Sequence, residues 1–324
     1  MNAAASSGSE RLEDVDLYLD LYRRMRLIRG FEDLVQSLFL RGEIYGTTHL
    51  YSGQEAVAVG FASVLEARDR VAATYRGHGH ALALGVDPQK LLDEMLGRAT
   101  GVNGGLAGSM NVTSPADRLI GCFGIVGGSI AAATGAGLAL RRTGGVAVAY
   151  FGDGATNQGY FFECLNFCQV LKLPVVLVCE NNGYGEYTAF EAVTAGGIRA
   201  RAEVMEVPAE TIDGMSVWTV REAARRATEH ARSGAGPAFV EAITYRFVGH
   251  SRSDPGKYRP EGELDRWRER DPLVLLRARL EQEGVEASRL DEIETSVEAD
   301  LAEYEERGLA APFPEPQTFA EFRA

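Results

Sequence analysis

The sequence lacks the features that mark membrane, secreted or nucleic-acid-binding proteins. No apolar run reaches the roughly 18 residues that a membrane-spanning helix requires, and residues 1–10 have neither the basic start nor the apolar centre of a signal peptide. Only 33 residues are Lys or Arg against 46 Asp and Glu, a net charge of −13, which argues against a nucleic-acid surface. We therefore expect a cytoplasmic protein with no membrane or nucleic-acid partner, and a disordered tail over residues 1–11.

Cysteine is also scarce, with four in 324 residues, all in or beside apolar segments. Cys164 and Cys168 are one helical turn apart, but no second pair of ligands accompanies them. Buried free thiols in a reducing compartment are therefore favoured over a zinc site.

The middle of the chain contains a β-α-β pattern. The apolar run Val146–Phe151 ends at Gly152-Asp153-Gly154, an amphipathic segment follows over residues 155–172, and Pro174–Cys179 is a second apolar strand. Asp153 should therefore lie at the carboxyl end of its strand, where open α/β sheets bind ligands.

The remaining pattern extends this unit in both directions. Periodicity predicts helices over residues 12–40 (two helices, or one broken near Gly30), 54–67, 88–96, 129–140 and 221–233, with strands over 70–74, 216–220 and 238–245. Residues 100–117 are rich in Gly and Ser and are typical of a functional or mobile loop. After Tyr258 the composition changes to charge-rich helices over 263–270, 273–283 and 288–308. We predict a doubly wound, mostly parallel α/β domain over residues 12–258 with a helical C-terminal extension over 259–324.

Two side chains of this pattern predict a cation site. Asn182 follows the second strand, so its amide can converge with the Asp153 carboxylate at one edge of the sheet. One carboxylate, one amide oxygen, a backbone carbonyl and diphosphate oxygens describe a magnesium–diphosphate site. Gly152 and Gly154 would let a phosphate approach the backbone, and a helix start offers N–H groups to it. The alternative is that Asp153 only caps the following helix.

The segment from Gly152-Asp153-Gly154 to Asn181-Asn182 resembles the thiamine diphosphate-binding motif. Four other segments occur in compatible order, and together the set resembles the alpha subunit of thiamine diphosphate-dependent 2-oxoacid dehydrogenases of the pyruvate and acetoin type: residues 74–80 (TYRGHGH), 124–128 (GIVGG), 172–174 (KLP) and 249–256 (GHSRSDPG). The similarity covers about residues 21–280. It implies a sheet of the thiamine diphosphate-binding type, with thiamine diphosphate and Mg²⁺ as cofactors.

The resemblance also implies roles for individual residues. Magnesium would be held by Asp153, Asn182 and the backbone carbonyl of Tyr184. The cofactor-binding residues would be Tyr75, Arg76, Gly124, Val126, Asp153, Gly154, Ala155, Asn182 and His250. Arg76 suits phosphate because its guanidinium can bind two oxygens at once, whereas glycine at position 124 allows close approach to the aminopyrimidine ring. Taken alone, these segments could equally be a solvated loop face, a turn and a helix-capping histidine.

Two histidines are the catalytic candidates. The resemblance places His49 at the substrate carbonyl and His250 at the cofactor phosphates, on a loop expected to order on cofactor binding. An ordinary imidazole can also pass a proton near pH 7. The alternative for His49 is a structural histidine, and His78 and His80 are supporting candidates beside the phosphate loop.

One required group is missing from the sequence motifs. Ionising the cofactor needs a carboxylate at its aminopyrimidine ring, which in the family comes from a separate beta subunit. The resemblance therefore implies an active site at a subunit interface and an assembly of two alpha and two beta subunits. The small residues of the predicted helix 129–140 suit a close subunit approach or, equally, tight packing on the sheet.

The leading functional hypothesis is oxidative decarboxylation of a 2-oxoacid, with pyruvate first, and acyl transfer to a lipoyl-bearing acyltransferase component. Acetoin cleavage is the alternative, and branched-chain 2-oxoacids are less favoured because that branch lacks a Gly-Ile-Val-Gly stretch at residues 124–127. A nicotinamide-binding fingerprint fails because Asn157 takes the place of its third glycine. A scaffold role would predict lost ligand residues, yet Asp153, Asn182 and Arg76 are present.

Overall fold

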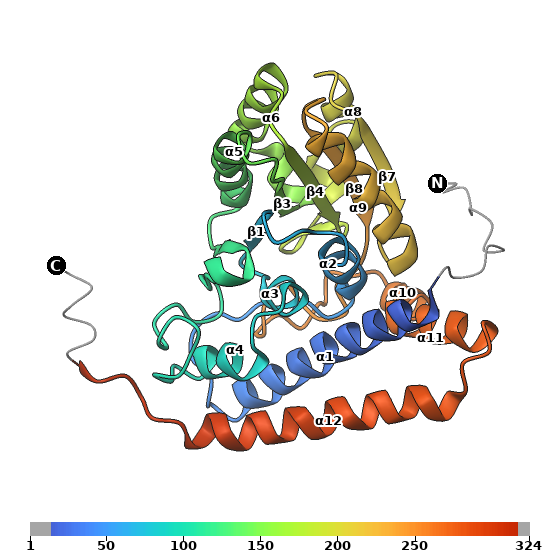
Figure 1. The fold of residues 1–324 in the computed structure, drawn as a ribbon. Coiled ribbons are helices and arrows are strands. Elements are labelled where there is room, and N and C mark those ends of the chain that lie inside the picture. Colours follow the sequence, from blue (N-terminus) through green and yellow to red (C-terminus); the bar gives the residue numbers. More distant parts are fainter. Residues whose placement is uncertain (1–13, 317–324) are drawn as a thin grey trace.

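The computed structural model describes residues 14–316, so the expected tail over residues 1–11 lies outside the described residues. Its centre is a six-stranded parallel sheet with helices on both faces, in the order β2-β1-β3-β4-β8-β7 (Figure 1). The strands are β1 (Arg70–Thr74), β2 (Leu119–Phe123), β3 (Ala147–Gly152), β4 (Val175–Asn181), β7 (Ala209–Asp213) and β8 (Ala238–Ile243). The predicted doubly wound α/β class is confirmed.

Alternate residues of the central strands supply two separate cores, as the two-residue period of a strand requires. On one face Ala149 and Phe151 pack with α5 (Gly128–Leu140), α6 (Gly159–Leu171) and α8 (Ile198–Glu203). On the other face Val148 and Tyr150 pack with α2 (Glu55–Ala62), α3 (His78–Leu84) and α9 (Val217–Arg232). Both faces are covered, so these strands are apolar throughout.

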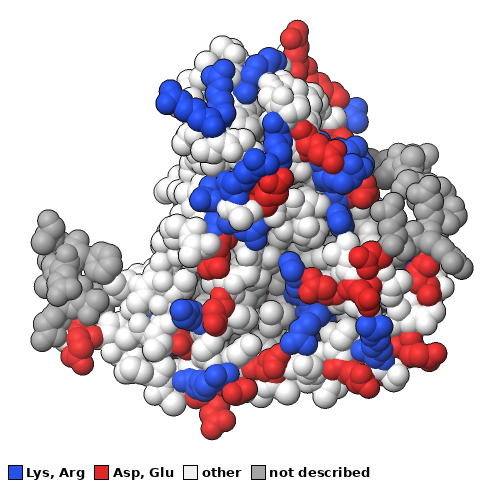
Figure 2. Space-filling model, in the orientation of Figure 1, with Lys and Arg blue, Asp and Glu red and all other residues white. Residues whose placement is uncertain are grey.

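A helical layer closes the second face, and basic and acidic side chains are interspersed over its outer surface (Figure 2). The first helix, α1 (Val15–Leu40), packs against α11 (Pro272–Gln282) and α12 (Ala287–Ala310), and α12 runs along its length (Figure 1). The short helix α10 (Glu263–Arg268) precedes α11 in the chain. The expected break near Gly30 is wrong, because α1 is continuous there. A Cβ at Gly30 would come within 2.5 Å of Leu301 Cδ1, so the glycine allows α12 to pack closely rather than ending the helix. No helix in residues 14–316 is long and apolar enough to cross a membrane.

A buried ionic group connects these layers. Arg29 on α1 donates from Nε to Glu55 at 2.6 Å and from Nη1 to Asp271 at 2.8 Å, joining the starts of α2 and α11. All three side chains are largely shielded from water. Removing one member of such a group leaves a buried charge without its partner, at a cost of about 3–5 kcal/mol.

The predicted loop over residues 100–117 is held in place by a buried carboxylate. It follows α4 (Pro88–Met95) and contains the short turn η1 (Pro115–Asp117). The fully buried Glu94 accepts hydrogen bonds at 2.7–3.1 Å from four backbone N–H groups, those of Asn103, Gly105, Ala107 and Gly108. One carboxylate therefore sets the path of this glycine-rich segment.

Several local predictions were wrong. Residues 216–220 are not a strand: Ser216 caps α9, with its Oγ accepting from the Thr219 N–H at 3.3 Å. The edge strand β7, the strand β2 and the helix α3 were missed, and residues 153–157 form the turn η2 (Asp153–Asn157) ahead of α6. The remaining elements are the two-residue strands β5 (Tyr184–Gly185) and β6 (Thr188–Ala189) and the short helix α7 (Phe190–Val193).

Candidate active site

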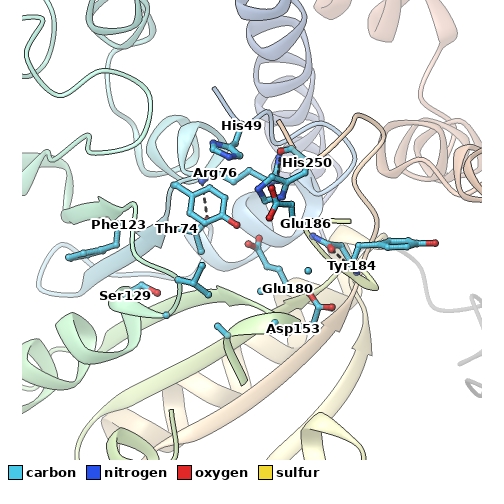
Figure 3. A pocket seen from close by; sticks show the side chains of 18 of the residues that line it. His49, Thr74, Arg76, Phe123, Ser129, Asp153, Glu180, Tyr184, Glu186 and His250 are labelled. Carbon is cyan, nitrogen blue, oxygen red and sulfur yellow. Dashed lines mark hydrogen bonds between the residues drawn. The ribbon is translucent and has the colours of Figure 1, made fainter. Parts of the chain in front are cut away.

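A cavity of about 450 Å³ opens at the carboxyl ends of β1, β2, β3 and β4 (Figure 3). Every site residue named from the sequence lines it: His49, Tyr75, Arg76, Gly124, Val126, Asp153, Gly154, Ala155, Asn182, Tyr184 and His250. Parallel strands bring their carboxyl ends to the same edge of a sheet, which explains how distant segments meet here. The sequence did not indicate four further lining residues, Gln54, Glu180, Glu186 and Arg246.

One corner of the cavity contains a carboxylate oxygen without a partner. Asp153 is only 2% exposed, and its Oδ2 has no hydrogen-bond partner in the structure. Burial raises the pKa of this carboxyl to about 6. Helix α6 begins at Gly159 with Gln158 as its N-cap, so the alternative that Asp153 caps this helix is wrong. A buried, unpartnered oxygen is costly unless a cation or a donor completes it.

Asn182 lines the same cavity and is held in a fixed orientation. Its Nδ2 donates to Gln54 Oε1 at 2.9 Å, and its Oδ1 accepts from the Tyr184 N–H at 3.2 Å. The described residues hold no group of three or more His, Cys, Asp or Glu side chains suited to a metal. A cation at this corner would therefore be bound by one carboxylate and by neutral amide and carbonyl oxygens, a donor set that suits Mg²⁺.

A second corner carries two buried guanidinium groups. Arg76 donates to the carbonyls of Leu50 at 2.5 Å and of His250 at 2.9 Å. Arg246 donates from Nη2 to the Glu186 carbonyl and to the Tyr258 hydroxyl, both at 2.6 Å. Within residues 14–316, neither Arg76 nor Arg246 forms an ion pair with a carboxylate. Burial, followed by the charge of Arg246, lowers the pKa of Arg76 to about 10.

Two positive charges without carboxylate partners favour an anionic ligand, and guanidinium groups suit phosphate oxygens. Of the lining residues that the sequence did not indicate, Arg246 contributes most to the charge of the site. It lies three residues after the end of β8, and nothing in its local pattern distinguishes it from a solvated arginine.

Three neighbouring aromatic rings line the cavity. The His49 ring lies 4.5 Å from the Tyr75 ring and 4.9 Å from the His250 ring, measured between centroids. Burial and then the charge of Arg76 lower the pKa of His49 to about 3 and that of His250 to about 4. The pKa of His49 thus lies well below the range in which an ordinary imidazole passes a proton near pH 7. Both imidazoles are neutral at pH 7 and can act as hydrogen-bond donors or acceptors.

Two further histidines, His78 and His80, hold the elements around the cavity in place. His80 Nε2 lies 3.2 Å from Glu180 Oε1, and the Tyr51 hydroxyl donates to the same carboxylate, which is 3% exposed. His78 links the Glu32 carboxylate at 3.0 Å to the Ser109 hydroxyl at 2.8 Å. These contacts fasten α3, which follows the loop after β1, to α1, β4 and the loop fixed by Glu94.

The rim of the cavity is apolar and exposed. Ile125 is 76% exposed and Val126 is 42% exposed, although both line the cavity. Gly124 lies between them and β2, with Asn111 Oδ1 3.7 Å from the point where a Cβ would be. Exposed apolar side chains at the mouth of a cavity suit contact with another molecule.

The fold and the cavity define an α/β protein with a ligand site at the carboxyl ends of its parallel strands. A family model described as "Dehydrogenase E1 component" matches residues 23–317. The chain therefore belongs to the dehydrogenase E1 component family.

Its relatives are named as alpha subunits. It is 39% identical to the pyruvate dehydrogenase E1 component subunit alpha of Porphyra purpurea, over 91% of this chain and 89% of that one. It is 41% identical to the acetoin:2,6-dichlorophenolindophenol oxidoreductase subunits alpha of Bacillus subtilis (91% and 89% covered) and of Cupriavidus necator (98% and 97% covered). The resemblance described from the sequence is confirmed, as is the expectation of an oxidoreductase subunit.

Proposed function

We propose that the cavity binds thiamine diphosphate with Mg²⁺ and that the chain is the alpha half of a 2-oxoacid dehydrogenase. The observation that carries this proposal is the pairing of one unpartnered, buried carboxylate oxygen on Asp153 with two guanidinium groups, Arg76 and Arg246, that lack carboxylate partners. A cation would compensate the Asp153 carboxylate, and a diphosphate would compensate the two guanidinium groups. Family membership supports the choice of thiamine diphosphate.

In this proposal the metal is held by the Asp153 carboxylate, the Asn182 amide oxygen and the Tyr184 carbonyl. Arg76, Arg246 and His250 bind the diphosphate, together with the N–H groups of Gly154 and Ala155 in η2. The backbone at Gly124 and Val126 contacts the aminopyrimidine. The cofactor supplies a carbon nucleophile that accepts the electrons released when a bond beside a carbonyl is cleaved.

The protein's own residues position the reacting groups and offer hydrogen bonds to them. His49 is neutral and its Nδ1 has no partner, so its ring can hydrogen-bond the oxygen of a substrate carbonyl. Tyr75 and His250 hold this ring from two sides. This arrangement fixes the ring before substrate arrives, which lowers the cost of ordering it later.

A beta subunit would complete the site. The carboxylates that line the cavity are Asp153, Glu180 and Glu186, and in Figure 3 all three lie away from Phe123, on the side of Tyr184 and His250. Glu180 is already bonded to Tyr51 and His80. The carboxylate for the aminopyrimidine would therefore come from a partner across the exposed apolar rim. We propose an assembly of two alpha and two beta subunits, located in the cytoplasm, as its free thiols also suggest.

The leading reaction is oxidative decarboxylation of pyruvate, with the acetyl group transferred to a lipoyl group on an acyltransferase component. Acetoin cleavage is the second candidate, because relatives named for acetoin are as similar as those named for pyruvate. The pyruvate-type relative from Zymomonas mobilis is likewise 41% identical. A branched-chain substrate ranks third.

The test is reconstitution. The chain is purified alone and with its beta subunit, then assayed with an artificial electron acceptor over pyruvate, branched-chain 2-oxoacids and acetoin. Turnover should require the beta subunit, thiamine diphosphate and Mg²⁺ together. Full activity of the isolated chain would refute the half-enzyme proposal, and an inactive assembly that binds no cofactor would refute the cofactor assignment.

A further inference from the structure

The apolar rim of the cavity contains a tight turn over residues 125–128, which we call the rim turn. The Gly128 N–H donates to the Ile125 carbonyl at 2.9 Å, and Gly127, the third residue, has a φ of +77° and a ψ of −1°. Val126, the second residue, is not among the residues with positive φ. These features identify a type II turn, whose third position favours glycine because it requires a positive φ.

The peptide bond between Val126 and Gly127 decides the type of this turn. Type I and type II turns differ mainly in the orientation of their central peptide, which is rotated by about 180° between them. The Tyr160 hydroxyl donates a hydrogen bond to the carbonyl of this peptide. A change of turn type would carry the carbonyl away from Tyr160 and break that bond, so the hydroxyl stabilises type II.

The ring of Tyr160 packs on the same peptide. A Cβ at Gly127 would lie 2.9 Å from both Cε2 and the hydroxyl oxygen of Tyr160. The ring therefore occupies the space that a side chain at position 127 would need. Ring and hydroxyl together hold the rim turn from its outer side.

Tyr160 also connects two halves of the site. It lies in the first turn of α6, directly after η2, which lines the cavity with Asp153, Gly154 and Ala155. The rim turn instead leads from β2 into α5, and α5 packs beside α6 (Figure 1). Under the proposed function, η2 binds the metal and diphosphate, and the rim turn contacts the aminopyrimidine. Tyr160 thus links the elements assigned to the two ends of the cofactor.

The rim turn has backbone donors to offer a ligand. Val126 and Gly127 line the cavity, and within residues 14–316 neither N–H group donates a hydrogen bond to another protein atom. Their orientation depends on the turn that Tyr160 holds. Donors that are fixed before a ligand arrives bind it with a smaller loss of conformational freedom.

We propose that Tyr160 is a positioning residue for the cofactor, because its hydroxyl keeps the rim turn in the type II form that contacts the aminopyrimidine; this inference rests on the proposed function. Tyr160 does not line the cavity, so it acts through the peptide between Val126 and Gly127. Its side chain is only half-buried, and loss of the hydroxyl leaves the packing of the ring in place.

The test separates the two ends of the cofactor in the assembled alpha–beta enzyme after its cofactor has been removed. Tyr160→Phe keeps the ring and removes the hydroxyl. Calorimetric titration with Mg²⁺ measures the affinity for thiamine diphosphate and for inorganic pyrophosphate, which lacks the aminopyrimidine. The variant should bind thiamine diphosphate about 2- to 10-fold more weakly, the usual range for one neutral hydrogen bond. It should bind pyrophosphate as tightly as the parent enzyme.

Three further variants serve as controls. Tyr45→Phe removes an exposed hydroxyl outside the cavity lining and should change neither affinity. Asp153→Asn should weaken both ligands, because both bind through Mg²⁺. Gly127→Ala strains the turn and displaces the Tyr160 ring, so it should weaken thiamine diphosphate and spare pyrophosphate. Adding Tyr160→Phe to Gly127→Ala should cause little further loss, because the turn that the hydroxyl holds is already disrupted.

The outcomes are distinct from those of the proposed function. A parent enzyme that does not bind thiamine diphosphate refutes the proposed function itself. If the parent binds it, an unchanged affinity in Tyr160→Phe overturns the role of Tyr160. Equal losses for thiamine diphosphate and pyrophosphate would also overturn it, because the effect would then lie at the diphosphate. Fully additive losses in the double variant would show that the hydroxyl does not act through the rim turn.

Discussion

Arg76 and His250, 174 positions apart in the chain, are joined by a hydrogen bond of 2.9 Å from the Arg76 guanidinium to the His250 carbonyl. The same guanidinium also holds the Leu50 carbonyl, in the segment that carries His49. One side chain from the end of β1 thus positions both candidate histidines. Its remaining donors face the cavity that we assign to diphosphate.

Arg76→Lys is expected to weaken thiamine diphosphate binding about 10- to 100-fold. Lysine keeps the charge but cannot bind two carbonyls and a phosphate in the fixed planar arrangement of guanidinium. Calorimetric titration in the presence of Mg²⁺ measures the loss. Arg252→Lys, in the His250 loop but outside the cavity lining, is the matched control and should bind normally. Equal affinities of both variants would contradict the assignment of Arg76.

Asp153→Asn should abolish magnesium-dependent cofactor binding and at the same time stabilise the free protein at pH 7. The pKa of the folded-state carboxyl is raised from 3.8 to about 6 by burial, so the folded protein binds a proton more tightly than the unfolded chain. Its stability falls as pH rises from about 4 to 6, by up to about 3 kcal/mol. The stability of the Asp153→Asn variant should not fall over this pH range.

Thermal unfolding from pH 4 to pH 8 and titration with cofactor check both halves of this prediction. Asp265→Asn, at an exposed position of α10, controls for the loss of a charge. A variant that still binds cofactor through Mg²⁺ would eliminate Asp153 as the metal ligand.

The loop over residues 247–260 should become more protected when cofactor binds. Asp254 organises it by accepting from the His250 and Gly256 N–H groups and from the Tyr258 hydroxyl. Limited trypsin cleavage near Arg252 or Lys257 should slow on adding thiamine diphosphate and Mg²⁺, because contacts at His250 offset the entropy of ordering the loop. Asp254→Asn should speed cleavage in the free protein. Identical cleavage with and without cofactor would count against this view.

His49→Ala in the assembled enzyme should lower transfer to the lipoyl group about 10²- to 10³-fold, the usual effect of losing one hydrogen-bond donor to a reacting oxygen, with little change in cofactor affinity. His49 lies at the proposed substrate end, so its loss should affect kcat more than cofactor binding. Because the pKa of His49 is lowered to about 3, the rate between pH 5 and 8 should not follow its titration. A variant that mainly loses cofactor would place His49 at the phosphates instead.

Glu94→Gln should destabilise the protein by about 3 kcal/mol and loosen residues 101–108. The four N–H groups that this carboxylate accepts would then face an amide, which offers one oxygen and one competing donor, and hydrogen bonds to charged groups are worth about 1.5–3 kcal/mol each. Denaturant unfolding and hydrogen exchange over this segment measure the change. Glu43→Gln, at an exposed site just after α1, should have no effect. Unchanged exchange would show that the carboxylate does not hold the loop.

The sequence predicted the part of the site that depends on strand ends. Apolar runs mark β3 and β4 locally, and parallel strands end at one edge, so Asp153 and Asn182 had to converge. The prediction from sequence failed where tertiary contacts determine the secondary structure. Residues 216–220 are rich in β-branched and aromatic side chains, yet the Ser216 cap and packing against the sheet make them the start of α9. The polar strand β7 lies at a sheet edge, where an apolar run is not required.

The missed site residues share one cause. Arg246, Glu180 and Gln54 acquire their roles from partners far along the chain: His80 for Glu180, Asn182 for Gln54, and the β5–β6 hairpin for Arg246. Spacing within a motif carries no information on such contacts. Only the three-dimensional arrangement shows that these polar groups point into one cavity.

The packing of α12 against α1 has a consequence for how the protein is made. Gly30 leaves the space that Leu301 fills, and the two positions are separated by about 270 residues of chain. A ribosome adds roughly 5–20 residues per second, so the apolar face of α1 waits on the order of tens of seconds for its partner. The nascent chain therefore exposes the part of α1 that α12 covers until α12 has been synthesised. Truncation within α12 would leave this face uncovered, which makes α12 a checkpoint for quality control by chaperones and proteases.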